Sequence, residues 1–218
     1  IIFEKNARSE IVDDRLKHMI IDGVLLPGQK INKKGLCEML DVSQTPINEA
    51  ISRMTGEGLI EQKSRQGFFI KSFSYTDLKE LYAVRAGLEG ISVRILSEQA
   101  SDEEIENIVK AFNEFSLPVE GKAVKKYEKA DRFFHEQILK LSRNSVILDF
   151  THNFAFIIKS YQKGLIRHPN DTLEEHKEIC RALRDREGEK AQKLIIEHHM
   201  KSREIIKHDH LRYSSVYV

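Results

Sequence analysis

The hydrophobic positions near the start of the chain recur at helical spacing. Ile11, Leu16, Met19 and Ile20 fall close to one face of a helix. The Gly- and Pro-containing stretch 23–28 follows and predicts a turn that ends this helix. The first element is therefore expected to be an amphipathic helix that ends shortly after residue 20.

Two more helices and a hairpin are predicted before residue 74. The helices and strands are expected at 33–40, 45–57, 59–62 and 68–70. Ser43 is well placed to cap the second of these helices, and Pro46 lies in its first turn, where the missing N–H is harmless. The polar stretch 64–67 forms the hairpin turn. This order predicts a winged helix-turn-helix, although a small α+β structural module has the same pattern.

From residue 75 onward the apolar residues keep a helical period. One stripe of the first helix, predicted over 75–99, carries Leu78, Leu81, Val84, Leu88, Ile91 and Ile95. Further helices are predicted at 101–115, 121–141, 145–164, 172–186 and 187–208. Ser101, followed by three acidic residues, predicts an N-cap for the first of them. These lengths suit an antiparallel helical bundle.

The expected fold class is therefore mainly α. A winged helix-turn-helix domain, with three helices and a two-stranded wing, is predicted at 1–74. An all-helical domain is predicted at 75–210, and a short frayed tail at 211–218.

Composition and charge exclude several classes of protein. The 218 residues hold 35 Lys and Arg against 34 Asp and Glu, which excludes a strongly basic protein that coats nucleic acid. The two cysteines, Cys37 and Cys180, lie far apart and form no CxxC pair, so a reducing compartment is expected. The start carries charges throughout, and no run of about 18 apolar residues occurs. We expect a cytoplasmic protein with no membrane partner.

The histidines are concentrated in the helical part. Asp131 and His135, four residues apart, share one helix face, and His176 and His198 lie on two later predicted helices. Three imidazoles and one carboxylate suit Zn²⁺, Ni²⁺ or another first-row ion. The alternative is that these side chains do not converge and are ordinary surface or core residues. That ordinary role is expected for the others, which are His152, His168, His199, His208 and His210.

The first part of the chain closely resembles the DNA-binding domain of GntR-family transcriptional regulators. The resemblance lies in GVLLPGQKI at 23–31, LCEMLDVSQTPINEAISRM at 36–54 and EGLI at 57–60. It implies that the third helix enters the major groove and that the wing tip approaches the minor groove. The implied DNA-facing positions are Lys34, Ser43, Gln44, Thr45, Asn48, Gln66 and Gly67. Arg53 and Arg65 would add positive charge.

Two of these positions depart from the family pattern. Gln44 and Asn48 stand where the family usually carries Arg. Arg recognises guanine with its bidentate fork, whereas Gln and Asn match adenine better. Two fewer cations also release fewer counterions, which weakens binding and its salt dependence. We therefore expect either an operator richer in A·T pairs or much reduced DNA binding.

The second part resembles the FCD effector domain of the FadR-type subfamily of GntR regulators. The resemblance lies in VRAGLE at 84–89, DRFFH at 131–135, Asn144, Glu175-His176 through Ala182 and Ala191 to His198. It implies that Asp131, His135, His176 and His198 are metal ligands, and it offers Arg85 as an anchor for a carboxylate effector. Arg85 is equally explained by an ion pair with Glu89. Asn144 is either a hydrogen-bond donor near the metal or, as we favour, the cap of the helix that starts at Ser145.

These features favour a ligand-responsive transcriptional regulator and not an enzyme. It would bind a roughly palindromic double-stranded operator as a homodimer, and a small carboxylate would enter the helical domain beside a divalent metal, Zn or Ni. One alternative is a metal-dependent hydrolase, in which the ion activates water. Another is a regulator whose metal is purely structural and whose DNA binding is weakened.

Overall fold

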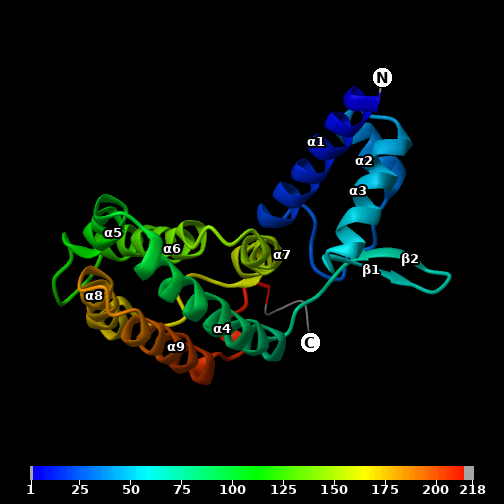
Figure 1. Ribbon diagram of the computed structural model, residues 1–218. Helices are drawn as coiled ribbons and strands as arrows, with labels where there is room; N and C mark the ends of the chain where they lie inside the picture. Colours follow the sequence, from blue (N-terminus) through cyan, green and yellow to red (C-terminus); the bar gives the residue numbers. More distant parts are fainter. Residues whose placement is uncertain (1, 214–218) are drawn as a thin grey trace. The chain divides into compact units, whose positions relative to one another are not determined.

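The computed structural model describes residues 2–213, with side chains for all of these but 2–9, 153 and 154. The chain divides into two compact units (Figure 1). The first combines the stretch up to Ser74 with Phe156–Tyr161 and the segment that begins at Arg212. The second combines Tyr75–Ala155 with Gln162–Leu211. Two short stretches from late in the sequence thus belong with the first unit.

The first unit contains the predicted winged helix-turn-helix. Its elements are α1 (Ile2–Ile21), α2 (Lys33–Leu40), α3 (Gln44–Gly56), β1 (Ile60–Lys63) and β2 (Gly67–Ile70). The strands pair antiparallel, with Ile60 opposite Ile70 and Lys63 opposite Gly67. Helix α1 packs on α3, whose buried face consists of Ile47, Ala50, Ile51 and Met54.

The apolar face of α1 contains the predicted Leu16 and Ile20, but Val12 takes the place of Ile11. Val12, Leu16 and Ile20 are buried at successive four-residue intervals, whereas Ile11 is 53% exposed. The prediction that Ile11 faces the core is therefore wrong. Because positions i and i+4 lie above one another on a helix, Val12 continues the line set by Leu16 and Ile20.

Local signals explain where the helices of the first unit begin and end. The Asn32 side chain caps α2 by accepting from the Gly35 N–H, and Asp41 ends α2 in the left-handed conformation, at φ 52°. Ser43 does occupy the N-cap of α3, but its hydroxyl accepts no capping hydrogen bond there. Ser43 is an exposed residue.

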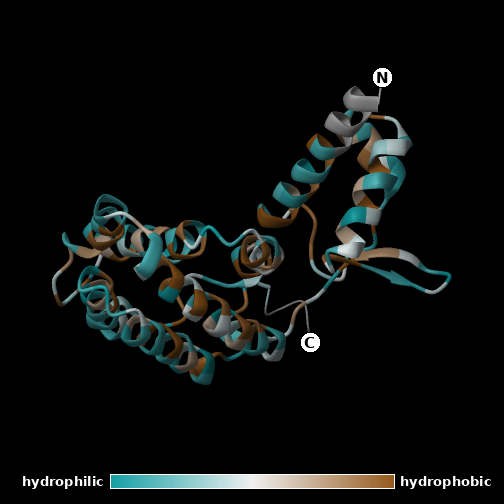
Figure 2. Cartoon of the chain, viewed as in Figure 1, coloured by the Kyte–Doolittle hydropathy of each residue, from teal (hydrophilic) through white to brown (hydrophobic). Residues whose placement is uncertain are grey.

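The second unit is helical throughout its regular elements. They are α4 (Tyr75–Gln99), α5 (Asp102–Val109), the 3₁₀ turn η1 (Lys110–Phe112), α6 (Lys122–Leu141), α8 (Pro169–Arg184), α9 (Gly188–Ile205), η2 (His208–His210) and the part of α7 (Ser145–Tyr161) that precedes Phe156. The predicted cap at Ser101 is confirmed, because its side chain and that of Glu104 form a reciprocal capping box. Helix α8 begins before residue 172, since His168 caps it and Pro169 occupies its first turn. Hydrophilic and hydrophobic residues are interspersed along these helices (Figure 2).

The predicted stripe of α4 is only partly buried. Leu78 is buried as expected, and Leu81, Leu88 and Ile95 are half-buried, whereas Val84 is 52% and Ile91 45% exposed. Helix α4 instead buries a face with small residues, including Ala86 and Gly90, against α9. A Cβ at Gly90 would lie 2.8 Å from the Ile196 side chain, so glycine permits the close approach of the two helices. The same face carries the buried polar residue Glu89.

The last predicted segment, 211–218, lies mostly outside the described residues, which end at 213. Its first residue, Leu211, is not frayed: it is buried and forms a β-bridge with Gln162. Among the described residues, no helix combines the length and the hydropathy that a membrane span needs.

Candidate metal centre and nucleic-acid interface

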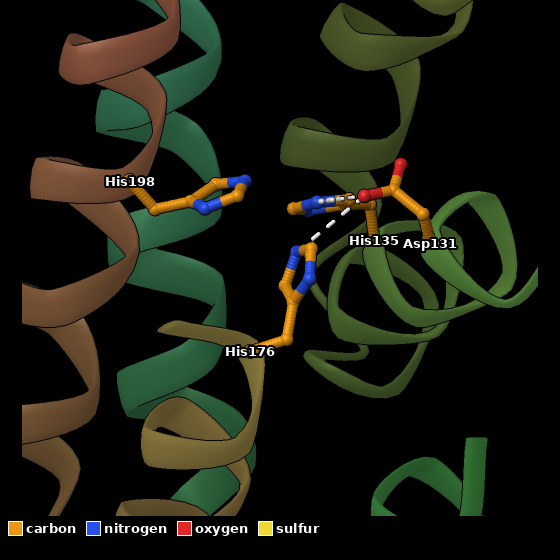
Figure 3. A group of neighbouring side chains, drawn as sticks. All are labelled: Asp131, His135, His176 and His198. Carbon is orange, nitrogen blue, oxygen red and sulfur yellow. Dashed lines mark ion pairs between the residues drawn. The ribbon is translucent and has the colours of Figure 1, made fainter. Parts of the chain in front are cut away.

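Three histidines and one aspartate from α6, α8 and α9 converge inside the second unit (Figure 3). Asp131 and His135 lie one turn apart on α6, His176 lies on α8 and His198 on α9. One potential ligand atom from each lies within 4.8 Å of all the others. Asp131 Oδ1 is 3.8 Å from His135 Nε2 and 3.5 Å from His176 Nε2. The structure thus brings together all four predicted ligands.

The second nitrogen of each imidazole is held by a neighbouring side chain. His135 Nδ1 lies 2.5 Å from Glu89 Oε2, and His198 Nδ1 lies 2.9 Å from Glu175 Oε2. His176 Nδ1 lies 2.6 Å from the Tyr127 hydroxyl. These partners orient the rings and leave Nε2 of each available to a metal, as outer partners do in protein metal sites.

The surroundings of His176 show whether its ring suits a metal ion. Its Nε2 is buried and has no hydrogen-bond partner among the described residues. Its ring stacks on Phe112, with ring centroids 4.5 Å apart. Burial, reinforced by the neighbouring histidines, holds the pKa of His176 well below its usual range, so the ring is neutral. A neutral imidazole with an unpartnered buried nitrogen fits a metal ligand.

Glu175, the partner of His198, contacts two cationic side chains. Its carboxylate also pairs with Arg167 at 2.7 Å and Lys201 at 2.8 Å. Partial burial raises the pKa of Glu175, but the hydrogen bonds from His198, Arg167 and Lys201 outweigh this and hold the pKa well below its usual range. Glu175 is therefore an ionised acceptor for His198 at neutral pH.

Glu89 is a further member of the site that the sequence analysis treated only as an ion-pair partner. Its side chain is fully buried on α4 and receives contacts from His135, Arg85 and His199. Burial raises the pKa of Glu89, but Arg85, His135 and His199 outweigh it, so the pKa lies well below its usual range. The sequence signal for this role is the spacing of Arg85 and Glu89, which places both on one helix face.

His199 is a core residue, one of the two ordinary roles expected for it, and it also contacts the network around the cluster. It is 1% exposed, and its Nε2 lies 2.9 Å from Glu89 Oε2. Adjacent positions on a helix point about 100° apart. Helix α9 is covered by both α4 and α8, so His198 and His199 are both buried. The remaining histidines match the expectation: His152 and His208 are exposed, His168 caps α8, and His210 Nδ1 accepts from the Lys207 N–H.

The two residues predicted to contact an effector have different surroundings. Arg85 forms the ion pair with Glu89, with Nε 2.5 Å from Oε1, and its side chain remains 14% exposed. Asn144 Oδ1 accepts from the Ile147 N–H at 3.1 Å, which is the capping geometry that we favoured. Arg85 therefore lies in the network around the cluster, whereas the contact of Asn144 belongs to the start of α7.

The predicted DNA-facing residues are at the surface of the first unit. Ser43, Gln44, Thr45 and Asn48 are exposed along the first turns of α3. Lys34 on α2 and the wing-turn residues Arg65 and Gln66 are exposed as well. Gly67 has φ +102°, a conformation that residues with side chains rarely adopt, so glycine avoids backbone strain at this start of β2.

Two polar contacts modify this surface. Lys33 Nζ donates to Asn48 Oδ1 at 2.8 Å and lies 4.6 Å from the ring centroid of Phe68. Lys33 thereby joins α2, α3 and the wing, a role that the sequence analysis missed. Arg53 lies 3.4 Å from Asp13 of α1, so part of its expected positive charge is compensated within the unit.

Each of the two parts of the chain matches a known protein family. Residues 8–70 match the bacterial regulatory proteins of the gntR family, and residues 80–201 match the FCD domain. The Nta operon transcriptional regulator of Aminobacter aminovorans is 30% identical over 180 residues, covering 79% of this chain and 81% of that protein. The uncharacterized HTH-type transcriptional regulator YdhC of Bacillus subtilis is 29% identical over 186 residues, covering 85% and 75%.

Solved structures share the fold. Escherichia coli McbR/YncC matches with a TM-score of 0.66 at 20% identity, covering 91% of this chain and 96% of that one. A GntR regulator from Rhodococcus sp. RHA1 matches with a TM-score of 0.67 at 21% identity, covering 92% and 97%.

The fold and the family matches define a DNA-binding transcriptional regulator and not an enzyme. The chain belongs to the GntR family, in the FadR-type branch that joins the winged helix to an FCD domain. Both resemblances in the sequence are thereby confirmed, and so is the choice of a regulator over a hydrolase.

Proposed function

We propose that this regulator senses a small carboxylate through a divalent metal, Zn²⁺ or Ni²⁺, held by Asp131, His135, His176 and His198. One observation carries the proposal: three buried imidazoles and one carboxylate converge, with ligand atoms within 4.8 Å of one another. A nitrogen-rich set with one oxygen suits these borderline ions better than Mg²⁺ or Ca²⁺. A bound ion would supply open coordination positions to water or to a ligand carboxylate.

The chain's own residues would orient and recognise the effector. Glu89, Tyr127 and Glu175 hold the three imidazoles with Nε2 free. Arg85, with 14% of its side chain exposed, offers a guanidinium next to the cluster for a second oxygen of the ligand. We therefore expect small carboxylates, such as sugar acids or di-acids.

The proposed output is a change in operator binding. GntR regulators are typically dimeric and bind operator DNA, so we expect a homodimer on a roughly palindromic operator in the bacterial cytoplasm. The effector changes DNA binding only if its affinity differs between the DNA-competent and DNA-incompetent states. Contacts to the operator are assigned to Lys34, Ser43, Gln44, Thr45, Asn48, Arg65, Gln66 and Gly67.

Metal analysis of the purified full chain tests the first step. We expect about one equivalent of metal per chain, lost in a His135→Ala/His198→Ala double variant. A protein that stays metal-free after purification without chelators, and takes up neither Zn²⁺ nor Ni²⁺ on addition, would refute the metal centre.

A carboxylate screen by thermal shift tests the sensing step. Sugar acids and di-acids should raise the melting temperature of the metal-loaded wild type, and the effect should vanish in His176→Ala. If chelation lowers stability while carboxylates cause no shift, the metal is purely structural and the sensing proposal is wrong.

A further inference from the structure

Glu89 connects three helices through a single carboxylate. It lies on α4 and is 1% exposed. Its Oε2 is 2.5 Å from His135 Nδ1 on α6 and 2.9 Å from His199 Nε2 on α9. Its Oε1 accepts from Arg85 Nε on its own helix at 2.5 Å. Of all these partners, only His135 belongs to the proposed metal ligands.

The chemistry of the partners determines which atoms carry protons. Arg85 has only donors to offer, so its contact is with a carboxylate that accepts. A carboxylate bound to a guanidinium in this way is ionised and has no proton to give. The two imidazole nitrogens that face Glu89 Oε2 must therefore carry their N–H. For His135 this means Nδ1–H, and in a neutral ring the lone pair is then on Nε2, the atom 3.8 Å from Asp131 Oδ1.

A second metal ion at Glu89 is the competing explanation. Glu89, His135 and His199 also place ligand atoms within 4.8 Å of one another. The Arg85 guanidinium, however, already neutralises this carboxylate. A cation there would meet a buried positive charge and would have to displace two N–H donors. Glu89 is therefore better suited to accept hydrogen bonds than to bind a metal.

We propose that Glu89 is a positioning residue that sets the Nδ1–H tautomer of His135 and thereby makes Nε2 the metal-binding atom. It also ties Arg85, the proposed effector anchor, to the metal ligand His135 through the same carboxylate. This inference rests on the proposed metal centre for its purpose, but the tautomer itself is a property of the metal-free chain.

The tautomer is measured directly in the metal-free full chain by long-range ¹H–¹⁵N correlation spectra of the histidine rings. We expect the Nδ1–H form for His135 in the wild type, assigned by its loss in His135→Ala. In Glu89→Gln the amide can donate to Nδ1, so the Nε2–H form should gain population. An Nε2–H or doubly protonated His135 in the wild type at pH 7.5 would overturn the proposal, whether or not the chain binds metal.

The consequence for metal binding is measured by titration with Co²⁺, whose visible absorption reports the coordination. We expect Glu89→Gln to weaken Co²⁺ affinity roughly 10–100-fold, the usual effect of losing an outer partner of a metal ligand. Glu98→Gln, on the same helix and 64% exposed at its side chain, is the matched control and should bind as the wild type does. Because Glu89→Gln leaves Arg85 buried without its carboxylate, the double variant Arg85→Met/Glu89→Gln is titrated alongside.

The titration distinguishes failure of the inference about Glu89 from failure of the proposed metal centre. If the folded double variant binds Co²⁺ as tightly as the wild type, Glu89 does not position His135 and the inference is wrong. If the wild type itself binds no Co²⁺, the proposed metal centre fails, while the tautomer spectra still decide the role of Glu89.

Discussion

Removal of one buried hydroxyl group, in Tyr127→Phe, should weaken metal binding without disturbing the fold. Tyr127 is fully buried, and its hydroxyl lies 2.6 Å from His176 Nδ1 and 2.8 Å from Thr172 Oγ1. With a metal on Nε2, Nδ1 must carry the proton and donate to the Tyr127 oxygen, which in turn donates to Thr172. The substitution breaks this chain and leaves a buried N–H without an acceptor.

The magnitude follows from these two hydrogen bonds. An unsatisfied buried polar group costs about 1–3 kcal/mol of stability. Metal affinity should fall roughly 10–100-fold, which corresponds to about 1.4–2.7 kcal/mol. Calorimetric titration of metal-free protein with Zn²⁺, in competition with a chelator, measures the affinity, and circular dichroism confirms that the variant is folded.

Tyr161→Phe is the matched control for this measurement. Tyr161 is also buried, and its hydroxyl donates to the Lys71 carbonyl at 2.6 Å within the first unit. It should lose a similar amount of stability and keep its metal affinity. If both variants bind Zn²⁺ equally well, Tyr127 does not support His176 and the reasoning fails.

Three further predictions concern the metal, the α7 cap and the DNA surface. Chelation should lower the melting temperature of the wild type but not that of His176→Ala. If the metal was present at a hundredfold excess over its Kd, the loss corresponds to about 2.7 kcal/mol of stability. Equal shifts in the two proteins would contradict the prediction. Asn144→Ala should lower the stability by about 1 kcal/mol in thermal melts, because the helix loses its cap. The thermal shift caused by carboxylates should be unchanged. Loss of that shift would instead favour a role for Asn144 in effector binding. Asn48→Arg should tighten binding to a mixed-sequence duplex and steepen the slope of log binding constant against log salt concentration by about one unit. Fluorescence anisotropy measures both quantities. An unchanged slope would place position 48 away from the phosphates.

The features that were predicted correctly from the sequence depend on near neighbours. The N-cap at Ser101, the turn that ends α1 and the hairpin turn of the wing all follow from residues a few positions apart. The order of helices and strands in the first unit follows from the same local rules. Asp131 and His135 share a face because any α-helix brings positions i and i+4 together.

The convergence of His176 and His198 on that face was left open by their spacing and implied by the family resemblance, but the partners around it were not predicted. Nothing in the sequence marked Tyr127 or Glu175 as a partner of an imidazole, since each becomes one only when the helices pack together. His199 was expected to be no more than an ordinary surface or core residue, and its position points about 100° away from that of His198. Only the position of α9, covered on two sides, buries both rings.

Helix α4 shows most clearly what the tertiary structure decided. Its sequence contains an apolar stripe through Val84 and Ile91 and, on another face, a line of small and polar residues through Ala86, Glu89 and Gly90. Periodicity alone selects the apolar stripe, because transfer of apolar surface from water is the largest local preference. The chain instead buries Ala86, Glu89 and Gly90 and leaves Val84 and Ile91 exposed, since glycine allows α9 to approach closely and Glu89 finds donors on α6 and α9. By itself, therefore, the sequence determined the elements and the identity of the four candidate ligands, whereas the packing of helices distant in sequence decided which polar groups surround them.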